Sequence, residues 1–290
     1  MLGIPIDSVG APDGGPAFGT ELSPEALRSH GIVPRLGAHD AGDLGVRITG
    51  SARDSQTGLV GGATVAPVVT AVRREVARLL RDGRRPLLLG GCCTLLVGAF
   101  PGAVDALGPL GLAYADGHLD LYDQRTSPTG EVADMPVSLL LGRGEPGLLA
   151  AAGPVPALTV ERLTVLGARD EDERRDLGPL AAELGVVNIE VAEIVADPRA
   201  VGRRTARSCD LGFWLSLDVD VLDQDAFPAT DYLMPGGLTL DQLHDLLEPI
   251  GRDQRLVGAS VACYNPTKDP TGEHGAALVD LLVDVLGGAA

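Results

Sequence analysis

The sequence predicts an α/β fold with three layers (α/β/α), in which helices cover both faces of a mainly parallel β-sheet. Short apolar runs alternate with helix-length stretches along the chain, and this alternation is typical of β-α-β units. The runs contain few polar residues, as expected for strands buried on both faces. No repeat, low-complexity tract or interdomain linker divides the 290 residues, so we expect a single domain spanning residues 1–290.

Local patterns predict the individual elements. Strands are expected at residues 3–5, 87–89, 112–115, 163–166, 185–189, 213–215 and 256–261. The clearest helices are expected at residues 65–82, 239–247 and 275–286. Ser23 and Thr239 each precede an acidic residue in a first helical turn, which predicts that both are helix N-caps. The Pro- and Ala-rich residues 145–156 are expected to form a loop.

Charge and cysteine content argue against several classes of protein. The formal net charge of −17 disfavours binding to nucleic acid, which depends on clustered Lys and Arg. Four scattered cysteines do not form a disulfide framework, and no basic segment precedes the first apolar residues, so we expect a cytoplasmic protein. The uncharged residues 86–104 are interrupted by paired Gly, paired Cys and Pro101. We therefore expect a strand, a metal-binding loop and a buried helix there, and no membrane span.

Two acidic motifs directly follow two of the predicted strands. They are Asp116, His118 and Asp120 after residues 112–115, and Asp218 and Asp220 after residues 213–215. Ligands of open parallel sheets bind beyond the carboxyl ends of the strands, so these side chains are predicted to converge. Carboxylates with one imidazole suit Mn²⁺, Fe²⁺ or Zn²⁺, and bridging carboxylates suit two metal ions about 3.5 to 4 Å apart. Solvated acids at strand ends are the alternative interpretation.

These motifs, together with Gly90-Gly91-Cys92-Cys93-Thr94, resemble the signature motifs of the ureohydrolase family of arginases and agmatinases, in order and in spacing. Further stretches match that family. They are Gly3-Ile4-Pro5, Gly14-Gly15-Pro16, residues 23–28, Phe227-Pro228-Ala229-Thr230, residues 235–239 and Asn265-Pro266. The similarity covers nearly the whole chain. It implies an arginase/deacetylase-like fold, a small-molecule substrate and a homo-oligomer of three or six chains.

The resemblance implies that two divalent metal ions are bound by six residues. They are Cys93, Asp116, His118, Asp120, Asp218 and Asp220. Asp116 and Asp218 would bridge the two ions. Cys93 and Asp120 would complete the shell of one ion, and His118 and Asp220 would complete the shell of the other. A hydroxide shared by the ions would be the nucleophile, and Asp120 and His118 are the expected catalytic side chains.

The first departure from the family pattern is Cys93, which stands where the motif G-G-D-H-S has a histidine, while Cys92 replaces its aspartate. A thiolate is softer than imidazole and adds a negative charge, which favours Zn²⁺ or Fe²⁺ over the Mn²⁺ that the family implies. Because the acids and the thiolate would outweigh the charge of two divalent ions, a site with one ion is an alternative. In another interpretation, both cysteines are small residues buried behind residues 87–89.

The second departure lies in the expected substrate loop, residues 122–136. Residues 129–133 read Thr-Gly-Glu-Val-Ala where arginases have S-G-N-x-H, so Ala133 occupies the position of a proton-shuttling histidine. Thr129 and Glu131 are the expected substrate-binding residues of this loop, although Glu131 is alternatively a solvated acid. By residue type, the candidates for the vacant shuttle role are His39, His274 and Asp134.

The third departure is Cys263, which occupies a position where the family normally offers a glutamate to the substrate guanidinium. A neutral thiol cannot form the bidentate ion pair that a guanidinium prefers, so free arginine and agmatine are poor candidates. Cys263 would instead bind another substrate, form a covalent adduct or fill space. Arg169, Asp170 and Asp172 match a family segment that holds the α-amino end of the substrate, and Asp172 is therefore a further substrate-binding candidate.

The sequence thus predicts a metal-dependent hydrolase that cleaves a non-peptide C–N bond in a linear amidine or a modified guanidine. One alternative is a catalytically silent ureohydrolase-like protein with a structural or assembly role. Another is a mononuclear zinc deacylase that uses Asp116, His118 and Asp218. The missing glutamate and histidine favour the silent protein, whereas the cost of burying many carboxylates without metal argues against it.

Overall fold

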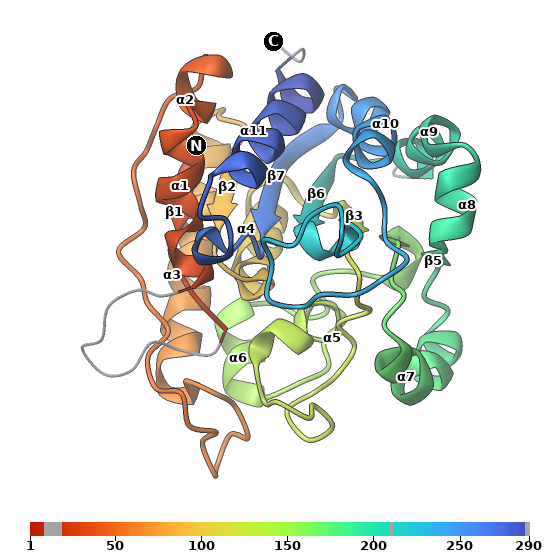
Figure 1. Cartoon of the computed structure of the whole chain (residues 1–290). Coiled ribbons are helices and arrows are strands. Elements are labelled where there is room, and N and C mark those ends of the chain that lie inside the picture. Colours follow the sequence, from red (N-terminus) through yellow and green to blue (C-terminus); the bar gives the residue numbers. More distant parts are fainter. Residues whose placement is uncertain (9–18, 209–210, 288–290) are drawn as a thin grey trace.

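A computed structural model describes residues 1–8, 19–208 and 211–287 and confirms the three-layer α/β/α architecture. Within these residues, seven parallel strands form one sheet in the order β1-β2-β7-β6-β3-β4-β5 (Figure 1). They are β1 (Leu2–Ile4), β2 (Leu87–Gly90), β3 (Gly111–Ala115), β4 (Leu163–Leu166), β5 (Asn188–Ile189), β6 (Phe213–Asp218) and β7 (Leu256–Ala262). The motif Gly14-Gly15-Pro16 lies outside the described residues.

The helices form two packed groups, in keeping with a layer on each face of the sheet (Figure 1). One group contains α3 (Gly62–Arg81), α4 (Leu96–Leu107), α5 (Pro136–Leu140) and α6 (Pro146–Ala152). The other contains α1 (Ser23–Ser29), α2 (Ile32–Arg35), α11 (Glu273–Leu286), α10 (Leu240–Gly251), α9 (Pro198–Ser208) and α8 (Val191–Ala196). Helix α7 (Glu171–Leu184) connects β4 to β5.

The core explains why the strand sequences are almost continuously apolar. Every residue of β2, β3 and β6 is buried, as expected for a parallel sheet that is covered on both faces. Trp214 is fully buried in β6, and its indole N–H donates to the hydroxyl of Ser260 in β7 at 3.1 Å. This bond satisfies a polar group that would otherwise be unpaired in the core.

Several element predictions are confirmed. Strand β4 has the predicted bounds, and residues 86–104 form β2, a 3-10 turn (Cys93–Leu95) and most of α4. Thr239 caps α10 through a capping box, because its hydroxyl accepts from the Gln242 N–H while the Gln242 side chain accepts from the Thr239 N–H. No helix among the described residues is both long enough and apolar enough to cross a membrane.

Three element predictions are wrong. Ser23 is the first residue of α1 and not its N-cap, because a 3-10 turn (Thr20–Leu22) continues directly into the helix. Residues 145–156 are not simply a loop, since Glu145 accepts a hydrogen bond from the Leu148 N–H and thereby starts α6. Strand β5 is shorter than residues 185–189, because residue 185 is the αL C-cap that ends α7.

A close backbone contact holds the loop after β2 against the chain after β1. The Gly91 N–H donates to Ile4 O at 3.0 Å, and the Cys92 N–H donates to Ile6 O at 3.2 Å. A Cβ atom on Gly91 would lie only 1.6 Å from Ile6 O. Because that obstacle is backbone, only glycine fits here, and it positions the two cysteines that follow.

We expect Gly91→Ala to lower the free energy of unfolding by about 1–3 kcal/mol or more, since the backbone of both segments must move to admit the methyl group. Gly45→Ala is the matched control, because no atom lies within 4 Å of its added Cβ. That control should change stability by less than about 0.5 kcal/mol. Urea denaturation of both variants measures the difference, and equal stabilities would contradict the close contact.

Candidate metal centre

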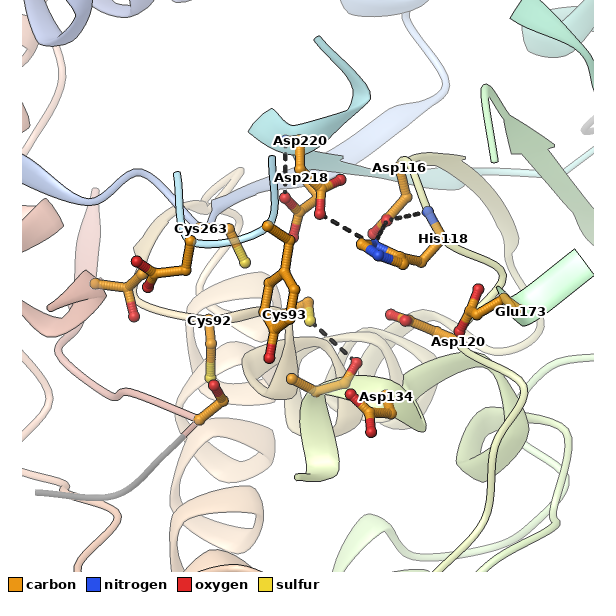
Figure 2. A pocket seen from close by; sticks show the side chains of 15 residues that line it. Cys92, Cys93, Asp116, His118, Asp120, Asp134, Glu173, Asp218, Asp220 and Cys263 are labelled. Atoms are coloured by element: carbon orange, nitrogen blue, oxygen red, sulfur yellow. Dashed lines mark hydrogen bonds and ion pairs between the residues drawn. The ribbon is translucent and has the colours of Figure 1, made fainter. Parts of the chain in front are cut away.

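A pocket lies at the carboxyl edge of the central strands (Figure 2). It encloses about 490 Å³, its open mouth included, a size suited to a small molecule. The acidic, imidazole and thiol residues of its wall are Cys92, Cys93, Asp116, His118, Asp120, Asp134, Glu173, Asp218, Asp220, Asp231 and Cys263. All six residues that the resemblance assigned to metal therefore reach one pocket.

Strand order explains why residues so distant in sequence meet. Strands β2, β7, β6 and β3 are consecutive neighbours in the sheet. Cys93 follows β2, Cys263 follows β7, Asp218 ends β6 and Asp116 follows β3. Asp218 pairs in register with Ala262, the residue before Cys263. Because all four strands run in the same direction, their polar end residues form one continuous row.

Asp116, His118 and Asp220 form one group of possible ligands. One ligand atom from each lies within 4.8 Å of the other two. The Nδ1 atom of His118 lies 3.0 Å from Asp220 Oδ2 and 3.5 Å from Asp116 Oδ1. The Gly117 N–H donates to Asp220 Oδ1 at 2.9 Å, which orients that carboxylate. The sequence predicted that these three side chains converge, and the structure brings them together.

Cys93, Asp218 and Cys263 form a second group, with one ligand atom from each again within 4.8 Å of the others. The Cys93 thiol donates to Ala133 O at 3.2 Å, and Asp218 Oδ1 accepts from the Asp220 N–H at 3.1 Å. The predicted shell placed Asp120 with Cys93 and Asp218. In the structure the third side chain beside Cys93 and Asp218 is Cys263, and not Asp120.

Asp120 lies in the pocket wall but in neither of these groups. The Tyr114 hydroxyl donates to its Oδ2 atom. The backbone of Asp120 has φ 51°, in the left-handed region that residues other than glycine rarely adopt. Such strain persists where surrounding structure holds it, and it is common at functional sites.

The electrostatics of the pocket favour a bound cation. Burial, and next the charge of Asp220, raise the pKa of Asp116 to about 6. Burial also raises the pKa of Asp120 and Asp218 well above the usual range. Against the effect of burial, Asp220 and Asp116 raise the pKa of His118. No Lys or Arg is among the described residues that line the pocket, so His118 is the cationic side chain within a wall that holds five buried acids, Asp116, Asp120, Glu173, Asp218 and Asp220.

The residues present fit a divalent metal. The Asp116 Oδ2 atom is buried and has no hydrogen-bond partner, although buried polar atoms are nearly always paired. Buried carboxylates without sufficient counter-charge are costly unless they coordinate a metal. The thiols and the imidazole of this site suit Zn²⁺ or Fe²⁺, and its carboxylates suit Mn²⁺.

The predicted substrate residues are distributed unevenly. Cys263 lines the pocket. Thr129 and Glu131 do not line it but bond to residues that do: the Thr129 hydroxyl donates to Asp134 at 2.6 Å, and Glu131 accepts from the Tyr232 hydroxyl at 3.1 Å. Of the three shuttle candidates, Asp134 lines the pocket, whereas His39 and His274 do not.

Asp172 requires a correction, because the structure does not bring it to the pocket. Its side chain is 78% exposed on α7 and pairs with Arg175 at 2.7 Å. Asp170 caps α7 by accepting from the Glu173 N–H. The Arg169 guanidinium donates to backbone carbonyls after β6, among them Asp220 O at 2.9 Å. Arg169 and Asp170 therefore support the site through the backbone. The acid of this segment that lines the pocket is Glu173.

Sequence reasoning missed Glu173 and Tyr232. Glu173 is buried in the pocket wall, accepts from the Leu119 N–H, and has a pKa that burial raises to about 7. A signal existed, since Glu173 shares a helical stripe with the buried Leu177 and Ala181. Tyr232 lines the pocket, and its ring lies edge-on to the His118 ring with the two ring centroids 5.7 Å apart. Nothing in its local sequence marks Tyr232.

The fold and the site together define an α/β protein whose parallel sheet lies between helical layers and carries candidate metal-ligand side chains at its carboxyl edge. The chain belongs to the arginase family, since the family model described as the Arginase family matches residues 1–287. This confirms the resemblance seen in the motifs. Dependence on a pair of metal ions is general in that family.

Individual relatives agree with this assignment. The chain is 27% identical to the arginase of Bacillus caldovelox over 295 residues, which cover 99% of this chain and 97% of that protein. The solved structure of that arginase matches with a TM-score of 0.86 at 26% identity, covering 99% of this chain and 97% of that one. The formimidoylglutamase structure from Bacillus subtilis matches with a TM-score of 0.76 at 19% identity, over 99% and 85% of the two chains. The second likeness concerns the fold alone.

We expect Asp116→Asn to stabilise the metal-free protein by about 1–3 kcal/mol, because the amide removes one buried negative charge beside Asp220. The same change should abolish the rise in melting temperature that divalent metal produces in the unaltered chain, because one carboxylate ligand is lost. Thermal denaturation with and without Zn²⁺ or Mn²⁺ measures both effects. Glu183→Gln, on the exposed side of α7, is the control and should show neither. A metal-induced rise that survives Asp116→Asn would count against a ligand role for this residue.

Proposed function

We propose that this chain is a metal-dependent hydrolase that cleaves a non-peptide C–N bond in a linear amidine or a modified guanidine. The observation that carries the proposal is the group of Asp116, His118 and Asp220, in which both aspartates are buried and Asp116 has an unpaired carboxylate oxygen. Membership of the arginase family supports the reaction class, because relatives that cover nearly the whole chain are named arginases.

The metal-binding residues follow from the two groups of ligand atoms. Cys93, Asp116, His118, Asp218 and Asp220 would hold two divalent ions. When bound, such ions would supply a strong nucleophile at neutral pH and would stabilise negative charge on the reacting carbon's substituents. Mn²⁺ is the expectation from the family, and the thiols make Zn²⁺ or Fe²⁺ alternatives.

Proton handling falls to Asp120 and Asp134 in this proposal. The Tyr114 hydroxyl fixes one oxygen of Asp120, which leaves the other oxygen for a ligand role or for a proton from the attacking water. Asp134 lines the pocket next to Ala133, where a shuttle histidine is missing, and its Oδ2 accepts hydrogen bonds from the Ser127 and Thr129 hydroxyls. In this proposal Asp134 would take over the proton exchange between the pocket and solvent.

The pocket wall indicates the kind of substrate. Its excess of carboxylates favours a molecule with a cationic end, and Glu173 is a buried acid available to bind it. Cys263 offers no carboxylate to a guanidinium, so the pocket is a poor match for the guanidinium of unmodified arginine. This proposal does not assign that role to Glu131, because Glu131 is not among the described residues that line the pocket and accepts a hydrogen bond from the hydroxyl of Tyr232. An N-hydroxylated guanidine, a formimidoyl group or an amide fits better.

We expect protein purified without added metal to contain about two divalent ions per chain, and Asp218→Ala to lose them. The reconstituted protein should release urea, a urea analogue or ammonia from a panel of amidines and hydroxyguanidines. Elemental analysis and product assays measure the two results. A single zinc ion with activity only on acyl amides would favour the deacylase alternative. Failure to bind metal after reconstitution would favour the silent protein and overturn the proposal.

We expect Glu173→Gln to raise KM for a cationic substrate by about 10- to 100-fold with a smaller effect on kcat, because an ionic hydrogen bond to a non-reacting end is lost. Asp172→Asn, one residue away but exposed on α7, should leave both constants unchanged. Steady-state kinetics on the two variants separates the residues. The reverse pattern would restore Asp172 as the substrate-binding acid.

A further inference from the structure

Two thiols from neighbouring strands meet on one side of the candidate metal centre. Cys93 follows β2 and Cys263 follows β7, and these strands pair in parallel. The Cys263 N–H donates to Gly91 O at 2.7 Å, which ties the end of β7 to the loop that carries Cys93. Figure 2 shows the two cysteines on one side of the cluster and Asp116 with His118 on the other.

The backbone of Cys263 is held in an unfavourable conformation. Its φ of 66° lies in the left-handed region, which disfavours residues with a Cβ atom. If the residue only filled space, glycine would suit this backbone without strain. Strained positions of this kind are typical of functional sites, where the surrounding structure holds a side chain in place. The strain therefore indicates that the direction of the thiol matters.

We propose that Cys93, Cys263 and Asp218 form a thiolate-rich metal position that selects Zn²⁺ or another thiophilic divalent ion over Mn²⁺. This inference rests on the proposed metal-dependent function and assigns Cys263 to the metal instead of to the substrate. The second position, formed by Asp116, His118 and Asp220, has only oxygen and nitrogen donors. The two halves of the centre therefore differ in the ion they prefer.

The chemistry of the donors supports the selection. The three side chains are buried, and their ligand atoms already lie within 4.8 Å of one another, so little rearrangement is needed to surround an ion. Thiolates are soft ligands that favour Zn²⁺ or Fe²⁺, whereas Mn²⁺ prefers carboxylate and water oxygens. Each thiol releases its proton to solvent when its sulfur–metal bond forms. Two sulfurs and one carboxylate would supply three protein ligands, the number that catalytic zinc sites use.

The test counts sulfur atoms around bound zinc by X-ray absorption. The full chain carries Cys209→Ser, since Cys209 lies outside the described residues, and is loaded with one equivalent of Zn²⁺. We expect about two sulfurs at ~2.3 Å in this parent, and one sulfur after either Cys93→Ser or Cys263→Ser. Zinc affinity should fall by about 100-fold or more in each variant, with Mn²⁺ affinity changed far less. Cys92→Ser is the matched control, because Cys92 is an adjacent buried cysteine outside the ligand group, and it should keep two sulfurs.

Cys263→Gly guards against a folding defect, because glycine accepts the positive φ while removing the sulfur. It should fold as judged by circular dichroism and still lose one sulfur. A sulfur count that is the same in the parent and in both Cys263 variants would overturn the inference.

Hydrolysis assays on the same samples separate this inference from the proposed function. Two sulfurs without amidine hydrolysis would support the thiolate position and contradict the function. Amidine hydrolysis by a protein whose zinc has only oxygen and nitrogen ligands would support the function and contradict the thiolate position. Absence of zinc binding in a protein that binds Mn²⁺ would overturn this inference alone, and failure to bind any divalent metal would overturn both.

Discussion

The parallel register of β2, β7, β6 and β3 is the constraint on which the site depends. These strands are consecutive in the sheet and run in one direction, so their last residues share one edge. Each strand end contributes one or more candidate ligands at that edge, and no single segment supplies both candidate ligand groups. Because side chains alternate along a strand, a slip of one residue in β6 would turn Asp218 to the opposite face. The apolar core that fixes the register thus also fixes the site.

The sequence predicted the features that depend on local pattern and on the direction of the strands. The convergence of Asp116, His118 and Asp220 followed from acids directly after apolar runs, and the Thr239 cap followed from its own turn. Features that depend on helix phase were missed. Glu171, Asp172 and Glu173 are consecutive acids in one helical turn, and only the stripe that Glu173 shares with Leu177 and Ala181 distinguishes it as the acid that packs inward. Likewise, the 3-10 turn before Ser23 has no sequence signal.

Strand order was the other missing information. The sequence placed Cys93 in a metal loop and Cys263 in a separate substrate strand, and nothing in either segment shows that β2 and β7 are neighbours. In the sheet they pair directly. A residue 170 positions away thereby enters the same ligand group as Cys93. Backbone strain at Asp120 and Cys263 was equally hidden, since neither is a glycine in a recognisable turn.

The neighbouring positions of Cys93 and Cys263 make two departures from the family pattern a single physical change. The resemblance places a histidine at one position and a glutamate at the other. A glutamate at position 263, beside Cys93 and Asp218, would add a second carboxylate to a buried cluster that has no cationic side chain of its own. A thiol is smaller, and it carries a charge only when a metal takes up its sulfur. In our proposal the change that made one metal position soft also removed the carboxylate for a guanidinium, so metal preference and substrate preference are coupled in this chain.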